Sequence, residues 1–323
     1  MMLVELLEAL IFPGFLFTIG LGFLFDWLER KVGAHMQGRI GPLVAGPHGL
    51  FQPVADFLKL LYKEEIVPSF ADVAIYRIAP SLFFLAPILG MLFVPVIGTK
   101  AVATFDMDLL FVVFLLAYSA FVVVILSFSS ASGYTTVASG RLVLQYVSYE
   151  IPLVIATITA AVFSGSLSLA GIVESQSRVW NILYMPFSFI VYIVAMMAEL
   201  EKPPFDIPSA KTEIVAGWLT EFSGRSLAFL KLTKEVSLVF GGGLAVALFL
   251  GGPLGPMPAN SVLVPVVYGT YFLLKLLAIV FLVFVLRTAL ARLKIAQAAE
   301  LFWKILTPLA LAQLALVIVL KGV

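Results

Sequence analysis

Between residues 198 and 221 the chain carries five carboxylates and two lysines, although 62% of its residues are hydrophobic. Apolar runs long enough to cross a bilayer flank this segment on both sides. Carboxylates that are removed from water gain a raised pKa and can exchange protons near neutral pH. The pattern therefore indicates proton handling at a membrane. The charged residues are Glu199, Glu201, Lys202, Asp206, Lys211, Glu213 and Glu221.

Three further charges belong to the apolar runs: Glu150 and Lys275 fall inside them, and Glu235 opens the run from residue 236. A charge at the bilayer centre costs about 2.5–3.5 kcal/mol on insertion scales, so such groups usually face a polar cavity or a partner. Several carboxylates in series could form a proton relay; alternatively, each could pair with a neighbouring Lys or Arg at the membrane edge. We expect Lys275 to pair with a buried carboxylate, the alternative being that its side chain snorkels to the surface. The candidate relay residues are Glu150, Glu199, Glu213, Glu221, Glu235 and Lys275.

The composition is that of a polytopic membrane protein. The mean hydropathy is +1.10 and only 12% of the residues are charged. Continuous apolar runs without alternation favour helices over a barrel. We therefore predict an all-α fold with eight transmembrane helices in a single integral membrane domain, residues 1–323. The runs are 4–25, 78–97, 109–128, 146–163, 182–197, 236–250, 264–286 and 302–320.

The basic residues predict the orientation. Of the 20 lysines and arginines, 16 lie in alternate connections, which indicates that these connections are cytoplasmic. The cytoplasmic loops are then about 26–77, 129–145, 199–235 and 287–301, and both termini face the extracytoplasmic side. The N-terminus has no basic segment and no small-residue cleavage site, so no signal peptide is predicted.

The first of these loops is interrupted by glycines and prolines between residues 38 and 53. The following segment, 51–64, has an apolar face and a charged face that includes Asp56 and Lys59. It is too short and too charged to span a bilayer, so we expect an amphipathic helix in the interface. A simple surface anchor is the alternative function for this helix.

The sequence lacks the residues that several kinds of functional site require. The chain has no cysteine, which excludes iron–sulfur ligation and disulfides on this polypeptide. His35 and His48 have no carboxylate at metal-ligand spacing, and there is no phosphate-binding glycine motif or Ser/His/Asp arrangement. We therefore expect no catalytic, cofactor-binding or metal-binding residue, and the net charge of +1 gives no indication of nucleic acid.

Three classes of function remain. The first is a proton-relay subunit of a larger redox-driven pump. The second is a secondary transporter, which would usually have repeated halves with broken helices, and these are missing. The third is a structural anchor for a cytoplasmic enzyme, which would give no reason for Glu150 and Lys275.

Residues in four separate loops resemble one family in order along nearly the whole chain, the H subunit of respiratory complex I, called subunit 1 in mitochondria. The matching residues are Glu29-Arg30-Lys31, Gln37, Arg39, Gly41-Pro42, Gly46-Pro47, Gly49, Gln52-Pro53, Ala55-Asp56, Lys59, Lys63-Glu64, Pro68, Ser148-Tyr149-Glu150, Ala198-Glu199, Pro204-Phe205-Asp206, Glu213, Gly217, Glu221-Phe222, Arg287, Arg292, Lys294, Gln297, Trp303-Lys304 and Pro308.

The resemblance implies an eight-helix subunit at the joint between the membrane arm and the cytoplasmic redox arm. Its first and third cytoplasmic loops would cover the cavity below the last iron–sulfur cluster. Its glutamates would line an acidic channel toward the ion-pumping subunits, with Glu221 near the mouth of that channel. The residues expected at the cavity and the redox-module interface are Arg30, Arg39, Asp56, Glu201, Lys202, Asp206, Lys211 and Arg292.

The third loop departs from the pattern of quinone-using relatives, in which Asn and Arg stand at the positions of Glu201 and Lys202. Glutamates are likewise replaced by Ser209 and Lys211. The departures resemble the M subunit of archaeal ferredoxin-linked membrane-bound hydrogenase and of its sulfane sulfur reductase relative.

We therefore expect a subunit of such an oxidoreductase complex that joins the cytoplasmic redox module to the ion-translocating module through buried glutamates. Its partners would be hydrogenase-like large and small subunits that hold iron–sulfur clusters, with a nickel–iron site in a hydrogenase, together with antiporter-like membrane subunits and the lipid bilayer of the cell membrane. The alternatives are a subunit of a quinone- or methanophenazine-reducing dehydrogenase and a structural anchor.

Overall fold

The computed structural model describes residues 2–256 and 263–321, with the side chains of 2–5, 211 and 212 left out. The described residues form helices and connections without a strand. The elements are α1 Met2–Leu10, α2 Phe15–Met36, η1 Pro47–Gly49, α3 Gln52–Tyr62, α4 Val73–Met91, α5 Asp108–Ser129, α6 Gly133–Ser164, α7 Leu169–Ser175, α8 Asn181–Tyr184, α9 Pro186–Glu199, α10 Lys211–Ile214, η2 Gly217–Leu219, α11 Gly224–Phe249, α12 Val264–Ala289, α13 Ile295–Glu300, a π-helical segment Leu301–Leu306 and α14 Thr307–Lys321.

The all-α, polytopic prediction is confirmed, but the count of eight spans is not. Seven helical segments of the described chain are long and apolar enough to cross a membrane. The predicted fifth span, 182–197, corresponds to α8 and α9, which a break at Met185 separates. The 14 residues of α9 cover only about 21 Å, less than the ~30 Å of a hydrocarbon core. The seven spans are Leu6–Met36, Val73–Met91, Asp108–Ser129, Gly133–Ser164, Gly224–Phe249, Val264–Ala289 and Ile295–Lys321.

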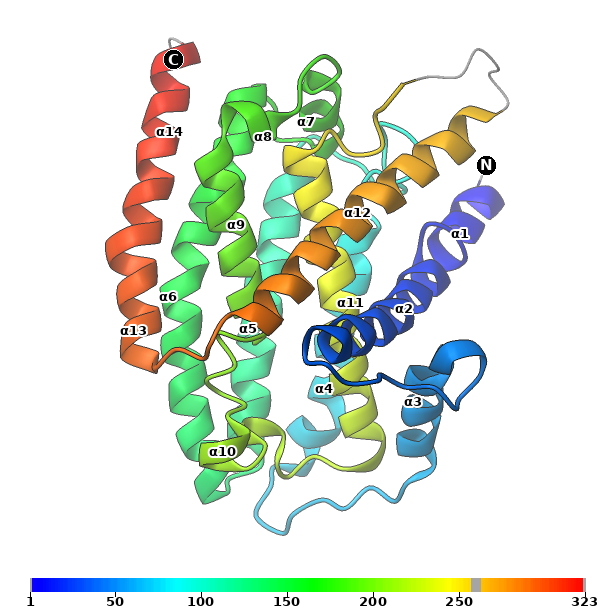
Figure 1. The fold of residues 1–323 in the computed structure, drawn as a ribbon, viewed down its shortest axis with the longest axis vertical. Coiled ribbons are helices and arrows are strands. Elements are labelled where there is room, and N and C mark those ends of the chain that lie inside the picture. Colours follow the sequence, from blue (N-terminus) through cyan, green and yellow to red (C-terminus); the bar gives the residue numbers. More distant parts are fainter. Residues whose placement is uncertain (1, 257–262, 322–323) are drawn as a thin grey trace.

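Helix α11 lies at the centre of the bundle (Figure 1). It packs against α4, α2, α12 and α3, and 83% of its apolar window is buried. Glycines allow this close approach, because a Cβ at Gly90 of α4 would lie 2.4 Å from the Phe240 ring of α11. Small residues at helix contacts are the usual device by which membrane helices pack tightly.

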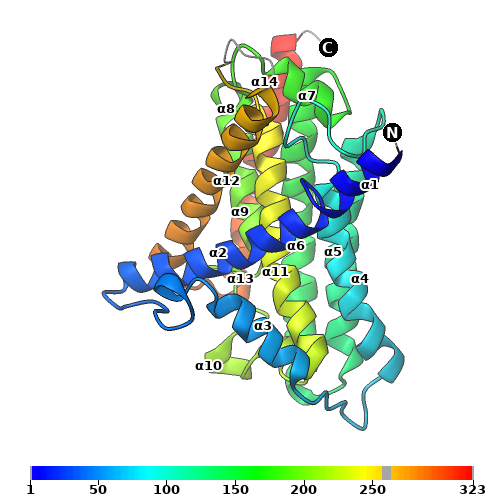
Figure 2. The same ribbon diagram turned by 90° about the vertical axis from the view of Figure 1, so that its right-hand side faces the viewer.

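Two helices run obliquely to the others. Helices α2 and α12 cross the bundle at an angle to the steeper α4, α5, α6 and α9, as Figures 1 and 2 show. Helix α3 lies beside α2 and the lower part of α11, where the Phe57 ring stands 5.6 Å from Phe23 of α2. The helix predicted over 51–64 is therefore present, as α3.

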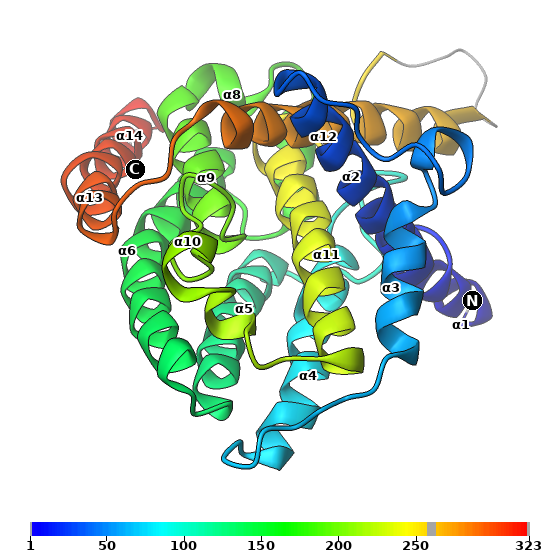
Figure 3. The ribbon, with the colours of Figure 1, turned by 60° about the horizontal axis from the view of Figure 1, so that its bottom comes forward.

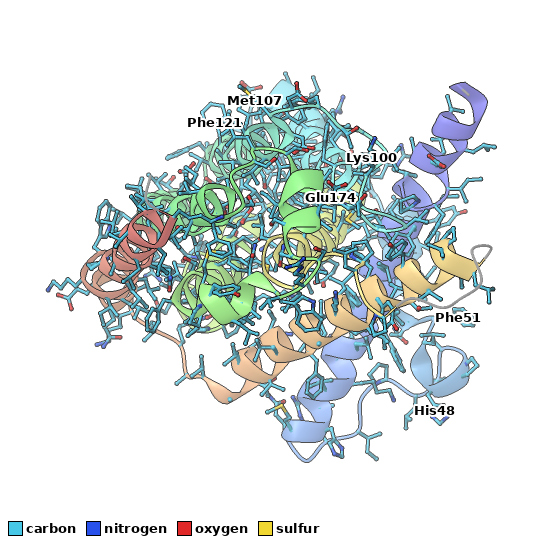
Figure 4. All side chains as sticks on the ribbon, turned by 90° about the horizontal axis from the view of Figure 1, so that it is seen from above. His48, Phe51, Lys100, Met107, Phe121 and Glu174 are labelled. Atoms are coloured by element: carbon cyan, nitrogen blue, oxygen red, sulfur yellow. The ribbon has the colours of Figure 1, made fainter. Side chains whose placement is uncertain are left out.

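The two ends of the molecule differ. Helix α10, the lower part of α3 and the connection from α9 to α11 lie at the lower end (Figure 3). Helix α1 and the end of α14 lie toward the opposite end (Figure 1). Seen from that end in Figure 4, Lys100 and Glu174 lie over the bundle, whereas His48 and Phe51 lie to the side, in the loop before α3.

Candidate functional site: a charged cavity and two buried carboxylates

A large cavity of about 1210 Å³ opens among α2, the segment after α9, the first half of α11 and the end of α12. Seven basic and five acidic side chains line it, together with apolar groups such as Leu219 and Phe222. A cavity of this size could bind the polar headgroup of a small molecule or a loop inserted by a partner protein. The charged lining residues are Asp26, Glu29, Arg30, Arg39, Glu201, Lys202, Asp206, Lys231, Lys234, Glu235, Arg287 and Arg292.

Helices that continue beyond their apolar runs supply much of this lining. Helix α2 extends through Met36 rather than ending near residue 25, since Gly33 is the only glycine or proline between residue 25 and Gly38. Helix α11 begins at Gly224, about three turns before the apolar run predicted from residue 236. Glu235 therefore lies within the helix and not at its start.

The turn after α9 directs two charged side chains, those of Glu201 and Lys202, to different partners. Glu201 N–H donates to Ala198 O at 3.1 Å and Lys202 N–H donates to Met197 O at 3.0 Å, the pair of bonds that forms a Schellman motif. Glu201 has a φ of 49° at the position where glycine is usual. For a residue with a Cβ this left-handed conformation costs roughly 1–2 kcal/mol, so interactions of its side chain must offset the strain.

The Glu201 side chain is 2% exposed and has two partners. Trp218 Nε1 donates to its two carboxylate oxygens at 3.0 and 3.1 Å, and Lys234 Nζ donates to Oε2 at 3.0 Å. The Lys234 ammonium also stands 5.1 Å from the centre of the Trp218 ring. Glu201 is therefore a buried, fully partnered carboxylate, not a surface loop charge.

Lys202 is equally buried, with 7% of its side chain exposed. It pairs with Glu29 of α2 and lies 3.6 Å from Glu235 Oε1 of α11. Glu29 also pairs with Arg287 of α12. This cluster connects three helices to the segment after α9, and removal of one member would leave an uncompensated buried charge, which typically costs about 3–5 kcal/mol.

Glu150 of α6 and Glu199 of α9 line one narrow cavity of about 10 Å³ together with Tyr149. Within the described part of the chain neither carboxylate has an ion-pair or hydrogen-bond partner, and both are partly buried. A second narrow cavity of similar volume is lined by Glu199, Glu201 and Lys234. The first two relay candidates, Glu150 and Glu199, thus lie together beside one narrow cavity.

The remaining relay candidates are placed differently. Glu235 lines the large cavity, and its Oε2 is buried without a hydrogen-bond partner among the described residues. Glu213 is paired with Arg141 and has 50% of its side chain exposed. Glu221 is partly buried and follows η2. Neither Glu213 nor Glu221 borders the narrow cavities.

The prediction of a carboxylate partner for Lys275 is wrong. Its ammonium donates to the carbonyl oxygens of Leu250, Gly252 and Leu254 at 2.6–2.9 Å, and lies 4.7 Å from the centre of the Trp180 ring. The last carbonyls of a helix lack intrahelical partners and carry partial negative charge, so the end of α11 at Leu250, together with two carbonyls of the connection after it, can hold a cation without a carboxylate.

Two ion pairs fasten the cavity walls. Arg30 Nη1 donates to Asp56 Oδ2 at 2.6 Å, which connects α2 to α3. Partial burial of Asp56 acts to raise the pKa of its carboxyl, but hydrogen bonds from Arg30 and Gln52 outweigh this and lower it. Arg292 donates from Nε and Nη2 to Asp206 at 2.9 and 2.5 Å, and this hydrogen bonding raises the pKa of the Arg292 guanidinium.

Two other expected interface residues contribute less. Arg39 is exposed at the cavity edge and donates to Gln37. The side chain of Lys211 lies outside the described residues. Among the side chains that are described, no group of three His, Asp or Glu could hold a metal ion.

Sequence reasoning missed the cavity residues Asp26 and Lys234, and Trp218, which donates to Glu201. The signal for Asp26 was its spacing of three and four residues from Glu29 and Arg30, which places all three near one face of a continuing helix. No comparable signal pointed to Lys234, because its partner Glu201 is 33 residues away in the chain.

Comparisons with known proteins identify the family. A family model described as NADH dehydrogenase matches residues 8–318. The second NADH-quinone oxidoreductase H subunit of Rhizobium etli is 37% identical over 305 residues, covering 92% of this chain and 88% of that protein. The H subunit of Thermomicrobium roseum is 36% identical over 317 residues, with 92% and 91% covered, and that of Bacillus cytotoxicus is 38% identical over 296 residues, with 91% and 87% covered. The chain therefore belongs to the NADH dehydrogenase family, as the multi-pass membrane H subunit of a complex of the NADH-quinone oxidoreductase, or complex I, type.

Proposed function

We propose that this subunit connects an electron-accepting cavity to the ion-translocating subunits of its complex through buried carboxylates. The observation that carries the proposal is the narrow cavity shared by Glu150 and Glu199, neither of which has a partner among the described residues. A structural anchor would gain nothing from unpaired carboxylates that are partly buried among apolar helices, because each ionised group costs desolvation free energy.

The proposed mechanism is electrostatic. Reduction of an acceptor in or beside the large cavity changes the charge balance there, and this change shifts the protonation of Glu235, Glu199 and Glu150. A proton then passes along the carboxylates toward neighbouring subunits. Glu213 and Glu221 are proposed to act near the exposed end of this route. Lys275 is left out of the relay, since its ammonium is held by backbone carbonyls.

The partners we propose are a cytoplasmic redox module with iron–sulfur clusters and antiporter-like membrane subunits, with the charged end of this subunit in the cytoplasm. The three relatives compared above are named as quinone oxidoreductase subunits, which supports a quinone as the acceptor. A ferredoxin-linked hydrogenase or sulfane sulfur reductase is the second candidate, supported by the adjacent charged residues Glu201 and Lys202 on the cavity wall, where quinone-using relatives have Asn and Arg. Isolation of the native complex and assay with quinone, protons and polysulfide as acceptors would distinguish them.

Substitution of the two unpaired carboxylates tests the relay. Glu150→Gln and Glu199→Gln keep the shape of the side chain but cannot ionise, so the complex should assemble while the number of ions moved per electron falls several-fold. The measurement is ion transport and electron transfer in inverted membrane vesicles. Glu300→Gln is the control, because that glutamate lies in an exposed i,i+4 pair with Lys304. A wild-type ratio of ions moved to electrons transferred in both test variants would contradict the proposed relay.

A further inference from the structure

The large cavity and the two narrow cavities are neighbours, because each shares lining residues with the next. Glu199 borders both narrow cavities. Glu201 and Lys234 border the second narrow cavity on one side and the large cavity on the other. Any polar route from the large cavity to the pair Glu150 and Glu199 through these spaces therefore passes the ion pair Glu201–Lys234.

Unpartnered hydroxyls line the same spaces. Ser237 Oγ, in the second narrow cavity, and Tyr149 Oη, beside the first, are both buried and have no hydrogen-bond partner in the described part of the chain. Buried polar atoms in native proteins are nearly always hydrogen-bonded, so such orphans point to water. A volume of about 10 Å³ is close to the smallest that holds one water molecule.

We propose that Glu201 and Lys234 form the proton-transfer step between the large cavity and Glu199. This inference rests on the proposed relay function and adds residues to it, since the resemblance to complex I assigns Glu201 only to the cavity loops. A proton from the large cavity binds the Glu201 carboxylate and weakens its pairing with the Lys234 ammonium, which stays charged. Glu201 then gives the proton, through one water in the second narrow cavity, to Glu199, and its restored negative charge re-forms the pair.

The backbone at Glu201 supports a role for the carboxylate beyond packing. A left-handed conformation at the end of a helix favours glycine, which has no Cβ, yet glutamate occupies this position with a φ of 49°. Strain at a non-glycine residue persists where surrounding interactions hold it and is characteristic of functional sites. Trp218 and Lys234 supply those interactions and aim the carboxylate at the boundary between the two cavities.

The experiment compares Glu201→Gln and the double variant Glu201→Gln/Lys234→Met with Glu199→Gln in the complete complex. The double variant removes both charges, so no buried charge is left unpaired. We expect it to assemble, and its ratio of ions moved to electrons transferred should fall several-fold, to the level of Glu199→Gln. The control is Glu300→Gln/Lys304→Met, which removes an exposed ion pair and should keep the wild-type ratio.

Each outcome decides between the alternatives. If the double variant keeps the wild-type ratio while Glu199→Gln loses it, this inference fails and the proposed function stands. If Glu199→Gln also keeps the ratio, the proposed function fails. If the Glu201–Lys234 pair only anchors the segment after α9, the double variant should either keep the wild-type ratio or fail to assemble into the complex. Either result would overturn the proposed proton-transfer step.

Discussion

At the scale of single residues, each buried cation of this protein is satisfied in its own way. Lys202 has two carboxylates, Lys234 has one carboxylate and an indole ring, and Lys275 has three carbonyl oxygens. Glu150 and Glu199, by contrast, have no ion-pair or hydrogen-bond partner among the described residues. The two unpaired groups therefore stand apart from charges whose role is to hold helices together.

The ion pair Arg30–Asp56 should make the stability of the contact between α3 and α2 depend on pH. The pKa of Asp56 is lowered in the folded state, so the pair stabilises the fold above the unfolded-state pKa of about 4 and loses this effect as pH falls through the folded-state value. Asp56→Asn should increase the rate of amide hydrogen exchange in α3 at pH 7. The difference in this rate between the variant and the wild type should become smaller below about pH 4. An effect of Asp56→Asn that is unchanged at low pH would contradict this account.

At the scale of elements, helix existence could be predicted from apolar runs, but helix ends could not. Helices α2 and α11 continue past their apolar runs, and their charged turns line the large cavity; a hydropathy pattern does not distinguish such helical turns from a loop. Helix α9 is shorter than a span because Pro186 opens it and the turn at Glu201 closes it. Burial by neighbouring helices lets such a short apolar helix lie inside the bundle.

The connection from α9 to α11 depends on one glycine. Gly217 has a φ of 63°, and a Cβ there would lie 1.8 Å from Pro208 O. Gly217→Ala should displace Trp218 from Glu201 and destabilise the connection by more than about 1 kcal/mol, seen as faster proteolysis between residues 205 and 222. Gly140→Ala is the matched control, because nothing lies within 4 Å of that position on α6. Equal proteolysis of the two variants would contradict the argument.

At the scale of the whole molecule, charge is unequally distributed. Helix α1 and the connection holding Lys100 lie toward one end, and α10 lies toward the other (Figures 1 and 4). The large cavity is lined by seven basic and five acidic side chains. An excess of Lys and Arg in loops marks the cytoplasmic side. The count of basic residues along the chain was sufficient to predict the orientation of the subunit in the membrane.

The orientation can be tested by thiol labelling, since the chain has no cysteine of its own. Lys100→Cys should react with a membrane-impermeant reagent added to intact cells, and Glu64→Cys should react only in inverted vesicles. Purification of this protein after labelling removes the contribution of cysteines in partner chains. The opposite pattern would reverse the proposed orientation.

The candidate site was predictable only in part. Acidic residues in apolar surroundings identified Glu150 and Glu199 from the sequence, because the cost of burying a charge can be judged locally. The pairs that complete the site connect residues far apart in the chain, such as Lys202 with Glu29 and Glu201 with Lys234. Which carboxylates are paired and which are not therefore required the three-dimensional structure.

The most direct test of the central claim is a redox-triggered infrared difference spectrum of the complete complex. If Glu199 takes up and releases a proton during turnover, the wild-type spectrum contains a carbonyl-stretch change of a protonated carboxyl group. This change should vanish in Glu199→Gln and persist in Glu300→Gln. A Glu199→Gln spectrum identical to that of the wild type would show that Glu199 does not change protonation, and the relay would be contradicted.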